Sequence, residues 1–193
     1  MSLDINVFLK EPNDALITPW IEELNKLGME CEIHPEFSFK DHSGFLPFKI
    51  KITSNSHEDL MNKEYLTGIE FYMDDFNLDE NIEKTEEPSL LGKLMGKKAQ
   101  VKYFASPEID EKLKHFNKVI TFNWGSADTF EFRMAMLASA TLARIAGGIS
   151  CYPTDEIWYN PETVVEESII EVAEYEISLK PHEFKLHEFE EWL

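Results

Sequence analysis

The sequence predicts an α+β fold, in which an antiparallel or mixed sheet is packed by a long buried helix and a C-terminal amphipathic helix. Segments with strand-like alternation lie mainly in the first half of the chain, and the strongest helical patterns lie in the second half. This order of strands and helices is typical of α+β proteins. With 193 residues, of which 43% are hydrophobic, the chain fits a single domain over 1–193.

Short runs of alternating apolar residues define the predicted strands. They lie at 4–10, 29–34, 45–53, 67–73, 99–106 and 118–124. Thr18 and Pro19 predict the start of a helix that ends at Gly28, since threonine caps helices and proline suits the first turn. Ser106 and Pro107 predict a second, shorter helix by the same reasoning.

The segment 127–146 predicts a long helix, with Ser126 as its N-cap and Gly147 at its end. This helix is apolar nearly all round, which is typical of a helix buried against a sheet. Arg133 and Arg144 then need partners or must reach solvent at the edges of the helix, because an unpaired buried charge is costly. The alternative for Arg144 is that it grips a ligand.

Three further segments complete the chain. Residues 74–98 are first acidic and then basic, and they contain proline and glycine, so we expect a long excursion from the domain. Asn160 and Pro161 predict the start of an amphipathic helix that runs to about residue 178. Residues 179–193 then form a C-terminal tail.

The net charge of −19 restricts the partners that the protein can bind. Residues 153–193 carry twelve acidic residues and two lysines, which is over half of the excess. Nucleic acid and anionic membranes would be repelled, so we expect neither as a partner, and basic proteins or cations remain. The start lacks a secretory signal pattern, and no apolar run is long enough to span a bilayer, so we expect a cytoplasmic protein. The oligomeric state stays open.

No catalytic, zinc or phosphate-binding motif is present, and we expect no enzyme activity and no cofactor. Residues 75–86 partly match the ligand spacing of a calcium-binding loop. Asp75, Asn77, Asp79 and Glu86 occupy positions one, three, five and twelve of such a loop. Position six is Glu80 where the sharp turn requires glycine, which favours a solvated acidic loop over a calcium-responsive module at 75–86.

The stretch GGISCYPTDEIWY, at 147–159, allows two interpretations. Its glycines can end the long helix and lead into a strand that buries Ile149 and Cys151. Alternatively, 147–156 lines the pocket of an enzyme or small-ligand binder of unrecognised type. A pocket with Asp155 or Glu156 beside Arg144 would favour this second interpretation.

The region after this stretch predicts a partner-binding surface. Its acidic residues are Asp155, Glu156, Glu167, Glu171 and Glu174, and its aromatic anchors are Trp158 and Tyr159, with Tyr175 nearby. Like charges three and four residues apart destabilise a helix by roughly 0.2–0.5 kcal/mol per pair. A surface that accepts this cost is either a solvated face that keeps the protein soluble or a site for a basic partner.

Three stretches together resemble known proteins. They are HPEFSFKDHSGFLPFKI (34–50), TGIEFYMDDF (67–76) and ITFNWGSADTFEFRMAMLASATLARIAGGISCYP (120–153). They resemble a group of small bacterial αβ proteins, some of which serve as cytoplasmic immunity factors for contact-dependent or type VI secreted toxins. The resemblance implies a binding protein that neutralises a basic toxin domain by covering its surface. It implies no site residues, because the shared pieces are turns, a cap and a core helix.

Overall fold

A seven-stranded antiparallel sheet forms the frame of the protein in the computed structural model, which describes residues 2–54, 58–82, 102–126 and 128–189. The strands are β1 (Ser2–Leu9), β2 (Met29–Ile33), β3 (Gly44–Ile52), β4 (Glu64–Asp75), β5 (Lys118–Gly125), β6 (Ile149–Tyr152) and β7 (Ile157–Trp158). Their order across the sheet is β2-β3-β4-β5-β1-β6-β7. Every pair is antiparallel, so the predicted α+β class is confirmed, with an antiparallel sheet.

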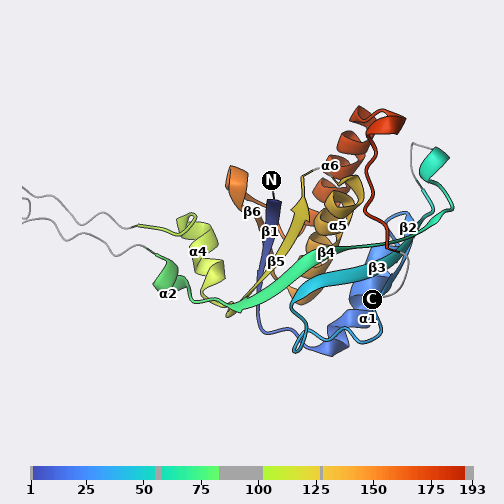
Figure 1. Ribbon diagram of the computed structural model, residues 1–193. Coiled ribbons are helices and arrows are strands. Elements are labelled where there is room, and N and C mark those ends of the chain that lie inside the picture. Colours follow the sequence, from blue (N-terminus) through green and yellow to red (C-terminus); the bar gives the residue numbers. More distant parts are fainter. Residues whose placement is uncertain (1, 55–57, 83–101, 127, 190–193) are drawn as a thin grey trace, which may run out of the picture.

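The helices cover the two faces of the sheet unequally (Figure 1). They are α1 (Ile17–Asn25), α2 (Leu78–Asn81), α4 (Pro107–Leu113), α5 (Thr129–Ala146) and α6 (Val164–Ser178). On one face α5 packs on strands β1, β4, β5 and β6, and both α1 and α6 pack on α5. On the other face, α2 and α4 cover only one end of the sheet, where they enclose a small second cluster with Phe8 and Cys151.

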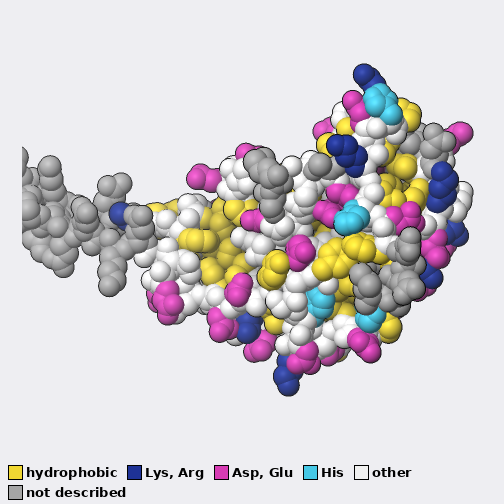
Figure 2. Space-filling model, in the orientation of Figure 1, with side chains coloured by type: hydrophobic (Ala, Val, Ile, Leu, Met, Phe, Trp, Pro, Cys, Tyr) yellow, Lys and Arg dark blue, Asp and Glu magenta, His cyan; other side chains and the backbone are white. Residues whose placement is uncertain are grey.

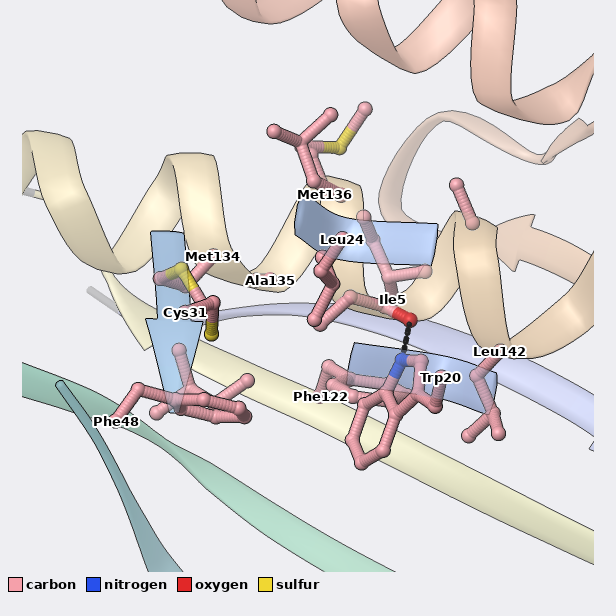
Figure 3. Close-up of a cluster of buried hydrophobic side chains, with 14 of the residues drawn as sticks. Ile5, Trp20, Leu24, Cys31, Phe48, Phe122, Met134, Ala135, Met136 and Leu142 are labelled. Atoms are coloured by element: carbon pink, nitrogen blue, oxygen red, sulfur yellow. Dashed lines mark hydrogen bonds between the residues drawn. The ribbon is translucent and has the colours of Figure 1, made fainter. Parts of the chain in front are cut away.

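The main core follows from the alternation of the strands. Ile5 pairs in register with Phe122, and Phe122 pairs with Phe71, so large apolar side chains form a continuous row beneath α5. Trp20 of α1 enters this layer, and its indole Nε1 donates a hydrogen bond to the carbonyl oxygen of Ala138 at 2.9 Å (Figure 3). One helix is thereby fixed on the other inside the core.

Helix α5 is buried along most of its length, as its apolar pattern predicts. Its N-cap is Asp128 and not the predicted Ser126, because the Asp128 carboxylate accepts hydrogen bonds from the backbone N–H groups of Phe130 and Glu131, each at 2.9 Å. Gly147 ends the helix as predicted, in the left-handed region with φ of 64°. Of the helices in the described ranges, none is long and apolar enough to cross a membrane.

Two other predicted helix starts are wrong in detail. Helix α1 begins at Ile17, before the predicted cap at Thr18. Helix α6 begins at Val164 and not at Asn160, because Asn160 instead forms a turn. Its carbonyl oxygen accepts hydrogen bonds from the N–H groups of Thr163 and Val164, at 3.0 and 2.8 Å. The proline after it therefore lies in this turn and not in the helix.

The predicted strand at 99–106 is wrong over 102–106, and residues 99–101 lie outside the described residues. The backbone N–H groups of Phe104 and Ala105 donate to the carboxylate of Asp110, both at 2.9 Å. A strand neighbour would need those same donors. The buried Asp110 therefore folds this segment into a loop that precedes α4.

The predicted excursion and the predicted tail are only partly described. Residues 74 and 75 end β4, α2 follows, and residues 83–98 lie outside the described ranges. The tail, described to residue 189, returns to the sheet: Phe189 donates a backbone hydrogen bond to Leu66 of β4 at 2.9 Å. Thr129 donates likewise to the Lys185 carbonyl oxygen at 2.9 Å. The tail thus lies beside the part of β4 that is not paired with β5.

Candidate functional site

Helix α6 presents a line of carboxylates away from the core. Its buried face packs on α5 through Val164, Val165, Ser168 and Val172. Glu167 and Glu174 are exposed and Glu171 is half-buried between them. The spacing of the three glutamates places them one turn apart along the helix.

Tyr152 ends β6 and precedes the turn that carries Asp155. Burial raises the pKa of Tyr152 above its usual value, and the negative charges of Asp155, Asp4 and Glu171 raise it further. We call Asp155, Glu167, Glu171 and Glu174 together the acidic surface. Asp4 is not part of it, because Asp4 lies on the other face of β1, with Asn6 and Phe8.

Tyr159 lies beneath the acidic surface and not on it. Its side chain is 4% exposed, so the prediction that its ring anchors a partner is wrong. Its hydroxyl lies 3.2 and 3.1 Å from the two carboxylate oxygens of Glu171, to which it donates. Burial and the charge of Glu171 together raise the pKa of Tyr159 well above its usual value. Tyr159 therefore positions Glu171, and the Thr163 hydroxyl donates to Glu167 in a similar way.

A row of aromatic rings runs beside the acidic surface. Tyr152 stacks on Trp124 with ring centroids 6.2 Å apart, Trp124 lies 5.9 Å from Phe132, and Phe132 lies 4.8 Å from Tyr175. Trp124 itself is buried, while the other three rings are partly exposed. Aromatic faces beside carboxylates attract guanidinium and ammonium groups.

The charge of the acidic surface is not balanced within the described residues. No lysine or arginine there forms an ion pair with any of its four carboxylates. Burial raises the pKa of Glu171, the hydrogen bond from Tyr159 opposes this shift, and the charges of Glu167 and Glu174 add to it. Burial is therefore the first cause of the raised pKa of Glu171, and the excess of negative charge from Glu167 and Glu174 adds to it.

This excess predicts that Glu171→Gln stabilises the protein at neutral pH. Glutamine keeps an oxygen that can accept from Tyr159 and removes two like-charge pairs, so we expect a gain of less than about 1 kcal/mol. Because the pKa of Glu171 is raised in the folded state, its ionised form costs stability only above the unfolded-state pKa, about 4.3. The difference between variant and wild type should thus be absent near pH 4 and grow as pH rises.

Urea unfolding of both proteins at about pH 4 and about pH 8 measures this difference. Glu162→Gln is a suitable control, because Glu162 is exposed and lies outside the acidic surface. A Glu171→Gln variant that is less stable than the wild type at pH 8 would contradict the unbalanced charge described above.

Glu156 and Trp158 face the other side of the sheet from the acidic surface. Glu156 adopts the left-handed conformation, with φ of 55°, and this reversal separates it from Asp155. Together with Trp158 it lines a cleft of about 440 Å³ between β1, β6 and the loop before α4. The residues predicted to bind one partner are therefore divided between two faces of the sheet.

The predicted pocket with Arg144 beside Asp155 or Glu156 does not form. Arg144 pairs instead with Glu23 of α1 at 2.7 Å and with Glu166 of α6 at 3.4 Å. It connects the two helices that flank α5, which agrees with an arginine reaching the helix edge. A cleft does exist at this part of the chain, but it contains Glu156 without Arg144.

Two of the residues weighed as calcium-loop positions have other partners in the structure. The carboxylate of Asp75 pairs with Lys118 at 2.8 Å, and Asn77 caps α2 by accepting from the N–H of Asp79 at 3.1 Å. Glu86 lies outside the described residues. Over the part of the chain that the structure describes, no three His, Cys, Asp or Glu side chains are placed to hold a metal ion.

No family model, curated protein or solved structure matches the chain. Function must therefore be inferred from the side chains themselves. Among the described residues, the acidic surface and the cleft beside Glu156 both have the chemistry to bind another molecule.

Proposed function

We propose that this protein is an acidic cytoplasmic binding protein whose acidic surface docks on a basic protein. The observation that carries the proposal is the presence of four carboxylates on the turn after β6 and on α6, with no ion pair to a cation in the described ranges. Lysine or arginine side chains of a partner would relieve this repulsion. The net charge of −19 would also steer a basic partner toward the protein.

The neighbouring aromatic row supports the same kind of partner. Tyr152 and Tyr175 lie at the two ends of that row and are partly exposed. A guanidinium group that pairs with a carboxylate can also stack on an aromatic ring, and such contacts are common among the residues that dominate binding energies. The acidic surface thus offers both charge and contact area to an arginine-rich face.

The partner that we propose is a bacterial toxin domain, which this protein would neutralise as an immunity factor. The proposal extends the resemblance described above and accords with a site that has charge and aromatic rings but no nucleophile–base pair. Neutralisation by covering a basic active site requires complementary surfaces and fast association, and it requires no catalytic group.

Capture from the source cell tests the docking proposal. Wild-type protein should retain a basic protein that elutes as salt is raised, and the variant Glu167→Gln/Glu171→Gln/Glu174→Gln should lose it. The matched control is Glu22→Gln/Glu36→Gln/Asp41→Asn, which removes the same charge from exposed residues elsewhere. We expect the first variant to weaken binding at least about tenfold, because three desolvated charge contacts are lost. Equal losses from both variants would contradict a specific surface.

Co-expression tests the immunity role separately. The captured partner should stop growth when it is expressed alone, and wild-type protein should restore growth. The triple glutamine variant should restore growth less well than the control variant. A captured partner that is harmless on its own would refute the immunity role while leaving the docking surface in place.

A further inference from the structure

The cleft beside Glu156 lies on the opposite face of the sheet from the acidic surface. Figure 2 shows hydrophobic side chains exposed between α4 and the strands of the sheet at this end of the molecule. Three separate parts of the chain form its walls: β1, the segment from Phe104 to Ile109, and the segment from Cys151 to Trp158. Its volume of about 440 Å³ is in the range of small-molecule sites.

Aromatic rings form one side of the cleft. Trp158 stacks on Phe8 with centroids 5.4 Å apart, and Phe104 lies edge-on to both, 6.0 Å from each. Phe76 supports the group from behind, 4.7 Å from Phe8. Phe104 is 37% exposed, so part of this aromatic wall is open to a ligand.

The buried Asp110 fixes the wall in place. It is 3% exposed, and its carboxylate oxygens accept the backbone N–H groups of Phe104 and Ala105, both at 2.9 Å. Ser106 then caps α4 through the N–H of Ile109. The backbone that carries the Phe104 ring is therefore fixed before a ligand binds. This lowers the conformational entropy that is lost on binding.

Few polar side chains line the cleft, and the charge among them is negative. Among the described residues, Glu156 is the only charged one that lines the cleft, and its backbone adopts the left-handed conformation that residues other than glycine seldom take. Cys151 lies at the inner end, where burial and then the charge of Glu156 raise the pKa of the thiol to about 12, so it stays protonated. Asn6 has its amide oxygen occupied by the Thr121 hydroxyl at 2.9 Å.

We propose that this cleft binds an organic cation, meaning an ammonium or guanidinium group carried on an apolar body. Aromatic faces attract such cations, and the Glu156 carboxylate provides a counter-ion at the same site. An anion would meet Glu156, and the described part of the chain places no lysine, arginine or histidine in the lining of the cleft. The protonated thiol of Cys151 suits an apolar body more than a reaction.

Binding of benzyltrimethylammonium, measured by titration calorimetry, tests the proposal. Its neutral carbon analogue, neopentylbenzene, has nearly the same shape and is the matched control ligand. The cation should bind more tightly than the analogue by between about 2- and 30-fold, the range of a cation–aromatic contact. Equal affinities, or no binding of the cation at millimolar concentration, would overturn the proposal.

Substitutions at Glu156 and Trp158 test whether the cation binds in the cleft and what each side chain contributes. Glu156→Gln and Trp158→Leu should each weaken binding of the cation. Glu156→Gln should leave the affinity for the neutral analogue unchanged. Glu162→Gln, which removes a charge outside the cleft, should change neither affinity. Thermal unfolding of each variant shows whether it is folded. An unchanged cation affinity in folded Glu156→Gln would overturn the role of the carboxylate.

A second ligand distinguishes the two sources of such a cation. Nα-acetyl-arginine methylamide represents an arginine side chain of a protein, and benzyltrimethylammonium represents a free small molecule. The tighter ligand identifies the source, and both results support an organic-cation site. Because the acidic surface is intact in every cleft variant, failure here leaves the docking proposal to be judged on its own test.

Discussion

Replacing Trp20 with alanine is expected to lower the free energy of unfolding by about 3–5 kcal/mol. The side chain is 0% exposed and contacts the rings of Phe39, Phe48 and Phe122. Its loss would leave a cavity between α1, α5 and the sheet and would remove the hydrogen bond to Ala138. Urea unfolding followed by circular dichroism measures the change, with an unchanged dependence on urea expected.

Trp20→Phe is the matched control. Phenylalanine keeps an aromatic ring in the layer and loses only the second ring and the Nε1–H donor, so we expect less than half of the effect of alanine. A loss below about 1 kcal/mol for Trp20→Ala would contradict a closed core at this position.

Glu176→Ala is expected to lower the free energy of unfolding by about 3–5 kcal/mol, which is the second large effect. The two carboxylate oxygens of Glu176 accept from Arg133 Nε and Nη2 at 2.7 and 2.9 Å. The two side chains are only 5% and 7% exposed. Alanine would leave the arginine charge buried between α5 and α6 without this bidentate partner.

The double variant Arg133→Met/Glu176→Leu separates pairing from burial. Because apolar residues need no partner, we expect its stability to return to within about 1 kcal/mol of the wild type or to exceed it. Glu111→Ala, which breaks the exposed pair with Lys114, should leave stability nearly unchanged. A double variant as unstable as Glu176→Ala would mean that helix packing, and not the unpaired charge, causes the loss.

Periodicity predicted most of the fold because most elements of this protein are long and regular. Helix α5 is apolar all round and is buried as expected, and strands such as β3 alternate clearly. The errors fall where a single side chain redirects the backbone. Asp110 takes the donors that a strand at 102–106 would have used, and Asp128 displaces Ser126 as a cap. Such contacts depend on tertiary structure and leave no periodic signal.

The candidate site was only partly predictable for a related reason. The stripe formed by Glu167, Glu171 and Glu174 follows from helix geometry and could be read directly from the sequence. The stacking of Tyr152 on Trp124 depends on the pairing of β1 with both β5 and β6, which sequence spacing does not reveal. The left-handed conformation of Glu156 could also not be predicted from the sequence, because glycine and asparagine are the residues that commonly adopt it.

The rate of association with the captured basic partner, measured at low and high salt, tests the central proposal most directly. We predict that the rate constant of the wild type falls at least about tenfold between roughly 0.05 and 0.5 M salt. For Glu167→Gln/Glu171→Gln/Glu174→Gln we predict slower association and a weaker salt dependence, while the control variant follows the wild type. A salt dependence that is the same in the triple glutamine variant and the wild type would contradict the acidic surface as the docking site.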